Sequence, residues 1–143
     1  IFICEIQQNS NCTYRMYDYD RRDKFGNPRE LHVAKSLDVV NPVKYVRDNK
    51  CNVMLTHNEH YMAKRLVQCK YFEVIKYEVE DEAKIPVDEA SFVSVIVVEG
   101  EGTIMTDDYD NEMKFKAGES FFISAGKRNI IVNGKSTCIV THV

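Results

Sequence analysis

The second half of the sequence is a series of short β-type runs separated by turn residues, and this pattern restricts the fold more than any other feature. Apolar and β-branched residues fill the runs, whereas Gly, Asn, Asp and Lys fill the gaps. Many short strands at regular spacing are typical of a sandwich or barrel. The predicted strands are residues 71–79, 91–98, 102–106, 112–115, 120–123, 128–132 and 136–142. We therefore expect an all-β body from about residue 70.

One helix is predicted before this body, over residues 28–40. Asn27 is a suitable N-cap, and Pro28 fits the first helical position, where its missing N–H costs nothing. Apolar residues then recur at helical spacing. The pair Asn41-Pro42 ends the helix, because the residue before a proline disfavours helical backbone angles.

The remaining segments give weaker signals. Residues 1–6 have the composition of a strand. An unpaired strand edge favours addition to the remaining barrel or self-association with another copy of the chain. Residues 43–70 give no clear prediction, and within them residues 61–69 fit either a short helix or an irregular strand.

Composition and charge exclude several classes of protein. With 44% hydrophobic and 29% charged residues, the 143-residue chain is typical of a globular domain. A net charge of −3 gives no reason to expect nucleic acid or an anionic membrane as a partner. The five cysteines are odd in number and form no Cys-x-x-Cys pair, which favours a reducing, cytoplasmic location. Since the chain starts without Met on an apolar run, we expect a fragment or a processed piece.

Two glycine-containing segments, residues 98–104 and 116–126, resemble the pattern of the cupins, which are small jelly-roll barrels that often hold a metal through His and Glu. This sequence departs from the metal-binding pattern, because no His lies between Gly102 and Lys116. The residues after Gly126 are also poor zinc ligands. They are Lys127, Arg128 and Asn129. We therefore expect a degenerate cupin with a scaffold role.

Two histidines, His57 and His60, lie in one polar segment. Their spacing brings the imidazoles together only in a helix, and the order differs from the His-Glu-x-x-His pattern of zinc proteases. A polar turn is the favoured interpretation, and a metal site is the alternative. His32 and His142 are expected to have structural roles.

The most specific signal is a polar and aromatic segment near the N-terminus. It begins Glu5-Ile6-Gln7-Gln8-Asn9-Ser10-Asn11-Cys12-Thr13-Tyr14-Arg15 and continues Met16-Tyr17-Asp18-Tyr19-Asp20-Arg21. The predicted helix opens with Pro28-Arg29-Glu30-Leu31-His32. Together with a terminal cupin half, these segments closely resemble the short bacterial form of the type I mannose-6-phosphate isomerases, over almost the whole chain.

The resemblance implies three parts. Residues 1–26 would be the last strand and active-site loop of a preceding catalytic cupin, residues 27–42 a connecting helix, and residues 43–143 a C-terminal degenerate cupin barrel. Enzymes of this family interconvert mannose 6-phosphate and fructose 6-phosphate with one zinc ion. The zinc ligands would lie upstream of Ile1, so this chain is expected to hold no metal ligand and to be inactive alone.

The resemblance also implies roles for three residues. The essential arginine of the family falls on Arg15, which is always protonated and therefore suits stabilisation of an oxyanion better than proton abstraction. Glu5, ten residues earlier, would bind substrate or take part in proton transfer. Arg21, six residues later, stands where related enzymes have Lys and would pair with phosphate. Without the resemblance, Glu5 reads as a solvated strand residue, and Arg21 and Arg22 read as surface partners of Asp18, Asp20 or Asp23.

Two functions from different classes therefore follow. The first is the C-terminal part of a mannose-6-phosphate isomerase, with a sugar phosphate as substrate. The alternative is a non-catalytic cupin-like module that binds a sugar or regulates a partner.

Overall fold

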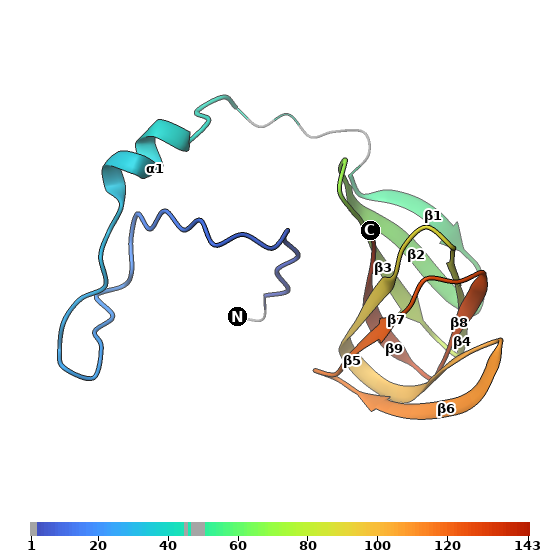
Figure 1. The fold of residues 1–143 in the computed structure, drawn as a ribbon. Coiled ribbons are helices and arrows are strands. Elements are labelled where there is room, and N and C mark those ends of the chain that lie inside the picture. The colour runs from blue at the N-terminus through green and yellow to red at the C-terminus, as the bar shows by residue number, and fades with distance from the viewer. Residues whose placement is uncertain (1–2, 45, 47–50) are drawn as a thin grey trace. The chain divides into compact units, whose positions relative to one another are not determined.

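The computed structural model describes residues 3–44, 46 and 51–143, and the chain divides into two units, Ile1–Val46 and Arg47–Val143. The N-terminal unit contains one helix, α1 (Val33–Val39). Over residues 51–143, the regular secondary structure of the C-terminal unit consists of strands (Figure 1). Among the described residues, no helix has the length and apolar character needed to cross a membrane.

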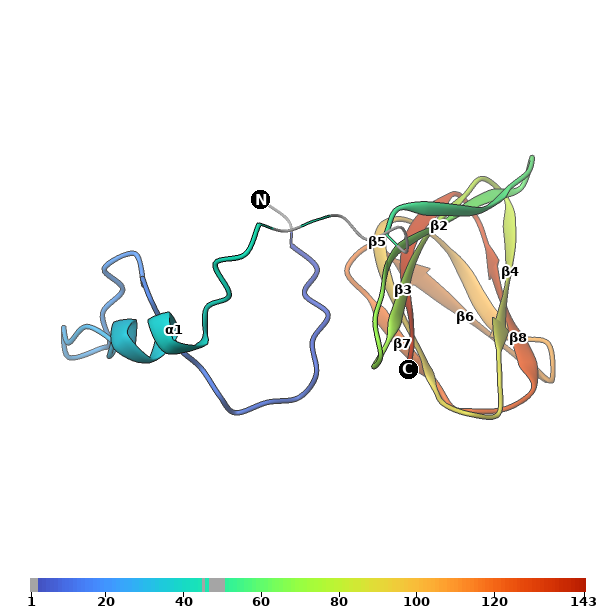
Figure 2. The same ribbon diagram turned by 90° about the horizontal axis from the view of Figure 1, so that it is seen from above.

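The strands of the C-terminal unit form a jelly-roll barrel of two facing sheets (Figure 2). All neighbouring strands are antiparallel, and the main order is β1-β2-β3-β9-β5-β8-β4, with β6 and β7 also pairing with β5. Their bounds are β1 (Val53–His57), β2 (Tyr61–Gln68), β3 (Glu73–Val79), β4 (Glu82–Val87), β5 (Val93–Thr106), β6 (Tyr109–Lys116), β7 (Ser120–Ile123), β8 (Arg128–Asn133) and β9 (Ser136–His142). The predicted all-β cupin-like fold is confirmed.

Strand β5 belongs to both sheets and joins them. Its first half pairs with β7 and β9, and its second half pairs with β6 and β8. The prediction of two strands separated by a turn was wrong here, because Gly100 and Gly102 lie within one continuous strand. A Cβ atom on Gly100 would lie 2.2 Å from the carbonyl oxygen of Lys135, and its φ is +87°. These glycines therefore permit a bend and a close backbone contact rather than a chain reversal.

Strand β4 was not predicted from the sequence. Its residues alternate between exposed and buried, with Ala83, Ile85 and Val87 facing the core. The strand contains Pro86, which has no N–H to donate, and prolines in sheets are confined to edges and bulges. β4 satisfies this restriction because it lies at the end of the strand order, beside β8.

The barrel interior is filled by apolar side chains from both sheets. The most enclosed of them, each fully shielded from solvent, are Ile85, Val95, Val97, Ile130, Val132 and Val140. Burial of this many branched side chains is the main source of stability for the barrel. The segment 61–69 proves to be the irregular strand of the two alternatives, since β2 has a register shift between Arg65 and Val67.

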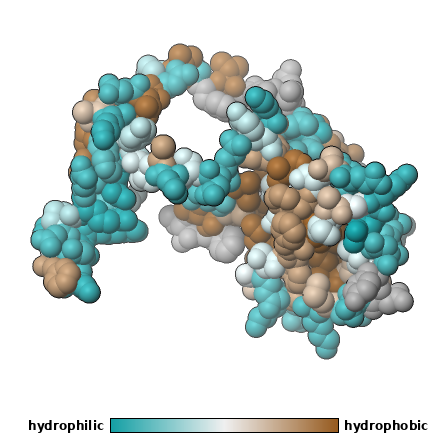
Figure 3. Space-filling model, in the orientation of Figure 1, coloured by the Kyte–Doolittle hydropathy of each residue, from teal (hydrophilic) through white to brown (hydrophobic). Residues whose placement is uncertain are grey.

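The N-terminal unit has a different character, because its described part has almost no core. Ser36 is its single buried residue, whereas Leu37 is 60% exposed and Phe25 is 76% exposed. Apolar side chains lie at the surface along α1 and the segment after it (Figure 3). The predicted strand over residues 1–6 is not formed at residues 3–6, and residues 1–2 lie outside the described part. A strand requires a neighbouring backbone to pair with, and no described segment pairs with residues 3–6.

The helix begins five residues later than predicted, at Val33 instead of residue 28. Pro28 instead forms an isolated bridge with Arg22, which holds it in an extended hairpin. His32 takes the N-cap position without a side-chain cap, because its ring accepts a hydrogen bond from Arg15. The end at Val39 agrees with the prediction within one residue. Contacts distant in sequence therefore override the local signals at the start of this helix.

Candidate functional site

The candidate site lies in the segment that follows the first described residues, and we call residues 14–32 the arginine loop. Its first feature is a tight turn, in which the Arg21 N–H donates to the Asp18 carbonyl oxygen at 3.0 Å. The two central residues, Tyr19 and Asp20, both have φ of +53°. Non-glycine residues are uncommon in this left-handed region, and they persist where surrounding contacts hold them. The turn is therefore a strained element that fixes the chain direction after Asp18.

A hairpin follows and reverses the chain. Asp23 organises it, because one carboxylate oxygen accepts the backbone N–H groups of Phe25 at 2.8 Å and Asn27 at 2.9 Å. The Asn27 N–H, followed by that of Phe25, lowers the pKa of Asp23 below its usual range. The bridge between Arg22 and Pro28 closes the hairpin. The chain thereby returns to the vicinity of the first turn.

Arg15 is held by the returning strand of this loop. Its Nη1 donates to the carbonyl oxygen of Glu30 at 2.9 Å. Its backbone N–H donates to Nδ1 of His32 at 3.2 Å, and the His32 N–H donates back to the Arg15 carbonyl oxygen at 2.7 Å. These contacts fix both the backbone and the side chain of Arg15, which stays 21% exposed.

Asp18 connects Arg15 to a second arginine. Its carboxylate accepts a hydrogen bond from Arg29 Nε at 2.7 Å and contacts Arg29 Nη2, and its Oδ1 lies 3.8 Å from Arg15 Nε. The Arg29 hydrogen bond holds the pKa of Asp18 below its usual value, with smaller contributions from Arg15 and Arg21. The same hydrogen bond raises the pKa of Arg29. With two arginines around one carboxylate, the cluster has a net positive charge.

The structure unites some of the predicted site residues and separates others. Arg15 lies within the loop, and the predicted phosphate contact Arg21 lies at the end of the strained turn. The Arg21 side chain is exposed and forms no hydrogen bond with any described residue. Glu5 is exposed and has no such partner in the part of the chain that the structure describes. Within this unit, Glu5 is thus not brought to Arg15 by any recorded contact.

Sequence reasoning missed the residues that hold Arg15. Asp18 was considered only as a surface partner of Arg21 or Arg22. Of those surface pairings, the one between Arg22 and Asp20 is formed, at 3.0 Å. The partner of Asp18 is Arg29, eleven positions away. The available signal was the turn residues between them, which predict that the chain doubles back.

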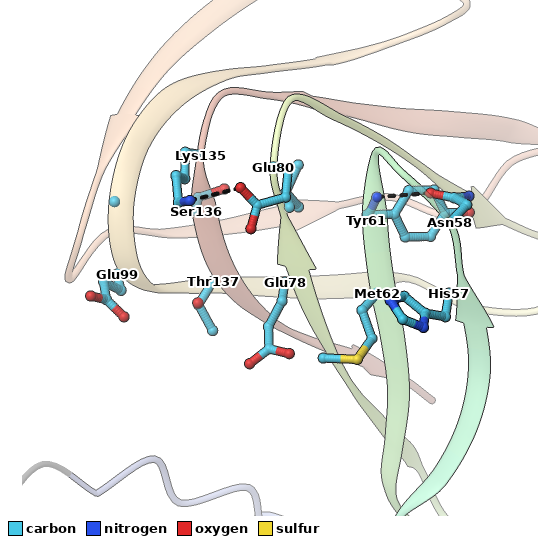
Figure 4. A pocket seen from close by; sticks show the side chains of 12 residues that line it. His57, Asn58, Tyr61, Met62, Glu78, Glu80, Glu99, Lys135, Ser136 and Thr137 are labelled. Atoms are coloured by element: carbon cyan, nitrogen blue, oxygen red, sulfur yellow. Dashed lines mark hydrogen bonds and ion pairs between the residues drawn. The ribbon is translucent and has the colours of Figure 1, made fainter.

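The barrel carries a separate hollow of about 470 Å³ on its outer surface (Figure 4). A row of side chains crosses five paired strands there: His57, Met62, Glu78, Thr137 and Glu99. Glu80 lies beside the row and forms an ion pair with Lys135 at 2.7 Å. Three glutamates and one lysine give this hollow a negative balance, which disfavours a phosphate group. The arginine loop has the opposite balance and is the better candidate for a phosphorylated ligand.

The two histidines of the polar segment lie in the β1–β2 hairpin rather than in a helix. His57 ends β1, whereas His60 lies in the turn, with Nδ1 2.9 Å from Asp81. Asn58 accepts the backbone N–H groups of His60 and Tyr61 at 2.9 and 2.8 Å, which is typical of an Asx turn. The ion pair with Asp81 raises the pKa of His60.

The donor set of this chain does not fit a zinc site. Among the described residues there is no group of three or more His, Cys, Asp or Glu side chains that could hold a metal. The barrel interior, where a cupin metal would bind, holds mainly apolar side chains. Asn129, after the second cupin segment, instead donates to Asp107 at 2.6 Å. Zinc requires several nitrogen, sulfur or carboxylate ligands in tetrahedral array, and the buried core cluster offers a single one, the sulfur of Cys138.

Comparison with known proteins finds relatives whose sequences align with almost the whole of this chain. The family described as "Mannose-6-phosphate isomerase, cupin domain" matches residues 62–143. The chain is 37% identical over 141 residues to the putative mannose-6-phosphate isomerase YvyI of Bacillus subtilis, covering 99% of this chain and 43% of the relative. It is 34% identical to the mannose-6-phosphate isomerase ManA of the same species, covering 100% and 44%. The chain thus spans less than half the length of these relatives.

Solved structures agree at the level of fold and family. The mannose 6-phosphate isomerase from Bacillus subtilis superposes with a TM-score of 0.78 and 35% identity, over 95% of this chain and 42% of that chain. The Streptomyces protein PAC13 superposes with a TM-score of 0.54 and 13% identity, over 69% of this chain and 82% of that one, which supports the cupin fold alone. On the match to residues 62–143, this chain belongs to the mannose-6-phosphate isomerase cupin-domain family.

Proposed function

We propose that this chain is the C-terminal part of a type I mannose-6-phosphate isomerase, which interconverts mannose 6-phosphate and fructose 6-phosphate. The observation that carries the proposal is the arginine loop, in which Arg15 is fixed at two points while its guanidinium stays accessible. The isomerase names of relatives aligned over the full chain support the same substrate.

The chemistry assigns Arg15 to the stabilisation of charge. Isomerisation between an aldose and a ketose moves a proton between neighbouring carbons through an enediol, and negative charge develops on the substrate oxygens. A fixed guanidinium stabilises such an oxyanion without needing to reorganise. Arg15 stays protonated at all relevant pH values, so it orients and stabilises rather than accepts a proton.

The other two predicted residues take binding roles in this proposal. Arg21 is exposed and its side chain forms no hydrogen bond or close ion pair among the described residues, so its guanidinium is available for a bidentate contact with phosphate. Glu5 is an exposed carboxylate that would hold sugar hydroxyls or move a proton. No described contact brings Glu5 to Arg15, so in this proposal the rest of the enzyme would bring the two side chains together.

The metal would come from outside this chain. Zinc polarises a carbonyl or orients two substrate oxygens when it is bound, and the described residues lack a suitable ligand set. We therefore assign the zinc ligands to the part of the longer enzyme that this chain does not span. The 143-residue chain alone is expected to be inactive.

The exposed apolar surface of the N-terminal unit supports this division. Side chains such as Leu37 and Phe25 are more than half exposed, and a unit with so little core cannot offset its conformational entropy by itself. We propose that residues 1–26 belong to a catalytic cupin, that residues 27–42 connect it to the second barrel, and that residues 43–143 form that barrel as a scaffold.

The test uses the full-length enzyme and a coupled assay for conversion of mannose 6-phosphate to fructose 6-phosphate. Arg15→Gln is expected to lower kcat/KM about 100-fold or more, the usual effect of removing a preorganised oxyanion donor. Arg22→Gln is the matched control, because Arg22 is an exposed arginine paired with Asp20 in the same loop, and it should change kcat/KM less than about threefold.

Two results would contradict the proposal. An active Arg15→Gln enzyme would remove Arg15 from catalysis, and a full-length protein without isomerase activity would favour a non-catalytic sugar-binding module. Metal analysis of the full-length protein and of the 143-residue chain then locates the zinc, which is expected only in the former.

A further inference from the structure

The side chain of Asp18 lies between two arginines and is only 11% exposed. Arg29 Nε donates to one carboxylate oxygen at 2.7 Å, and Arg29 Nη2 contacts the other. That second oxygen also lies 3.8 Å from Arg15 Nε. The Asp18 carboxylate thus contacts Arg29 directly and faces the Nε edge of Arg15, the proposed catalytic arginine.

Arg15 is restrained along two edges of its guanidinium. The Nε edge faces Asp18, and Nη1 donates to the Glu30 carbonyl oxygen at 2.9 Å. Nη2 has no hydrogen-bond partner among the residues that the structure describes. A guanidinium carries five N–H donors in one plane, so fixing two edges leaves the Nη2 side to present donors to a ligand.

The backbone around Asp18 is restrained as well. Its carbonyl oxygen accepts the Arg21 N–H at 3.0 Å, across two residues with φ of +53°. A left-handed conformation at Tyr19 costs free energy, because its Cβ crowds the backbone. Strain of this kind is maintained where the surrounding contacts require it. The turn therefore fixes the backbone of Asp18 relative to Arg21.

We propose that Asp18 is the positioning residue for Arg15: it orients the guanidinium so that its Nη2 edge faces the substrate, and its own charge beside Arg15, rather than its pairing with Arg29, is what this requires. This inference rests on the proposed isomerase function. Asp18 does not touch the substrate. Its effect is to restrict the rotamers of Arg15 before the substrate binds, so that less conformational entropy is lost in the transition state.

The test compares Asp18→Asn with Arg29→Gln in the full-length enzyme. Both substitutions break the Asp18–Arg29 ion pair, but Arg29→Gln leaves an ionised carboxylate beside Arg15. Asp18→Asn is expected to lower kcat about tenfold or more, with KM changed less than about threefold, since the lost interaction acts in the transition state. Arg29→Gln is expected to lower kcat less than about threefold. Their melting temperatures should fall by similar amounts.

Equal losses of kcat in the two variants would overturn the proposal, because Asp18 would then act only as the structural partner of Arg29. Asp18→Glu keeps the charge but displaces it by one methylene, and it replaces Asp18→Asn if that variant does not fold. An unchanged kcat for Asp18→Glu, with wild-type stability, would also overturn it.

The proposed function fails separately. A wild-type enzyme without isomerase activity, or an active Arg15→Gln variant, would contradict both proposals. A wild-type enzyme that needs Arg15 but tolerates Asp18→Asn removes only the role of Asp18.

Discussion

Arg15 and His32 exchange two hydrogen bonds: the Arg15 N–H donates to Nδ1 of His32 at 3.2 Å, and the His32 N–H donates to the Arg15 carbonyl oxygen at 2.7 Å. An imidazole nitrogen can accept such a bond through its lone pair, so this pair fixes the orientation of the His32 ring, with Nδ1 facing the Arg15 N–H. The pair joins the backbone of the proposed catalytic residue to the first turn of α1.

Loss of the His32 ring should therefore impair catalysis in the full-length enzyme. His32→Ala leaves the Arg15 N–H without its partner, and kcat/KM is expected to fall about tenfold, or about 1.4 kcal/mol. His32→Asn is the matched control, since its side-chain oxygen can occupy the position of Nδ1 and should retain most of the activity. Wild-type activity in His32→Ala would show that the pair has no part in positioning Arg15.

The barrel should be sensitive to a side chain at Gly100. A Cβ there would lie 2.2 Å from the Lys135 carbonyl oxygen, with φ at +87°. Gly100→Ala is expected to reduce the free energy of unfolding by about 2 kcal/mol or more, because strain and steric overlap add. Gly118→Ala is the control: its φ is +92°, but nothing lies within 4 Å of the added atom, so only the cost of the left-handed conformation, about 1 kcal/mol, should appear. Urea unfolding of both variants makes the comparison, and equal losses would contradict the steric argument.

Two histidines should give the stability of the barrel opposite pH dependences. Burial lowers the pKa of His142 below 6.5, against the opposing effect of Glu73 and Asp88. The contribution of neutral His142 to the free energy of unfolding is complete above pH 6.5. It is lost as the pH falls from there through the pKa of the folded state. Asp81 raises the pKa of His60, so its contribution is complete below pH 6.5 and is lost as the pH rises through the folded value.

Denaturant unfolding between about pH 5 and pH 8 checks this, since ordinary histidine titrates in that range. Relative to the wild type, His142→Asn should be less destabilising at the acid end than at the alkaline end. His60→Asn should show the reverse, with its largest loss at the acid end. Parallel curves for the two variants would contradict the assignment.

The proposed scaffold role of the barrel can be tested by a conservative change in its core. Ile130 is fully buried, and Ile130→Val should lower the free energy of unfolding by about 1 kcal/mol through the lost methylene. In the full-length enzyme, kcat/KM should stay within about twofold of the wild type. A larger loss of kcat/KM in a folded enzyme would show that the barrel takes part in the reaction.

The strands were predictable where local pattern and tertiary environment agree. Residues 71–79 and 136–142 were predicted as strands and form β3 and β9. β3 alternates in burial over most of its length, whereas β9 is a largely buried apolar strand between β3 and β5. β4 was missed although Ala83, Ile85 and Val87 alternate cleanly, since proline argues against a strand unless its edge position is known. Edge position is a property of the whole sheet.

The helix start shows the limit of local signals. Asn27 and Pro28 are suitable residues for the beginning of a helix. In the structure, the Asn27 N–H donates to Asp23 and Pro28 pairs with Arg22. Both residues therefore form part of the hairpin instead of a helix. The hairpin returns the chain so that Glu30 and His32 contact Arg15.

The sequence by itself determined the fold class and the family, because hydrophobic period and local motif are encoded in neighbouring residues. Only the tertiary structure decided that β5 runs unbroken through Gly100 and that Arg15 is held by Asp18 and His32. These are choices among partners distant in the chain. Each polar group and each strand has several possible partners of similar chemistry, and packing of the complete unit selects among them.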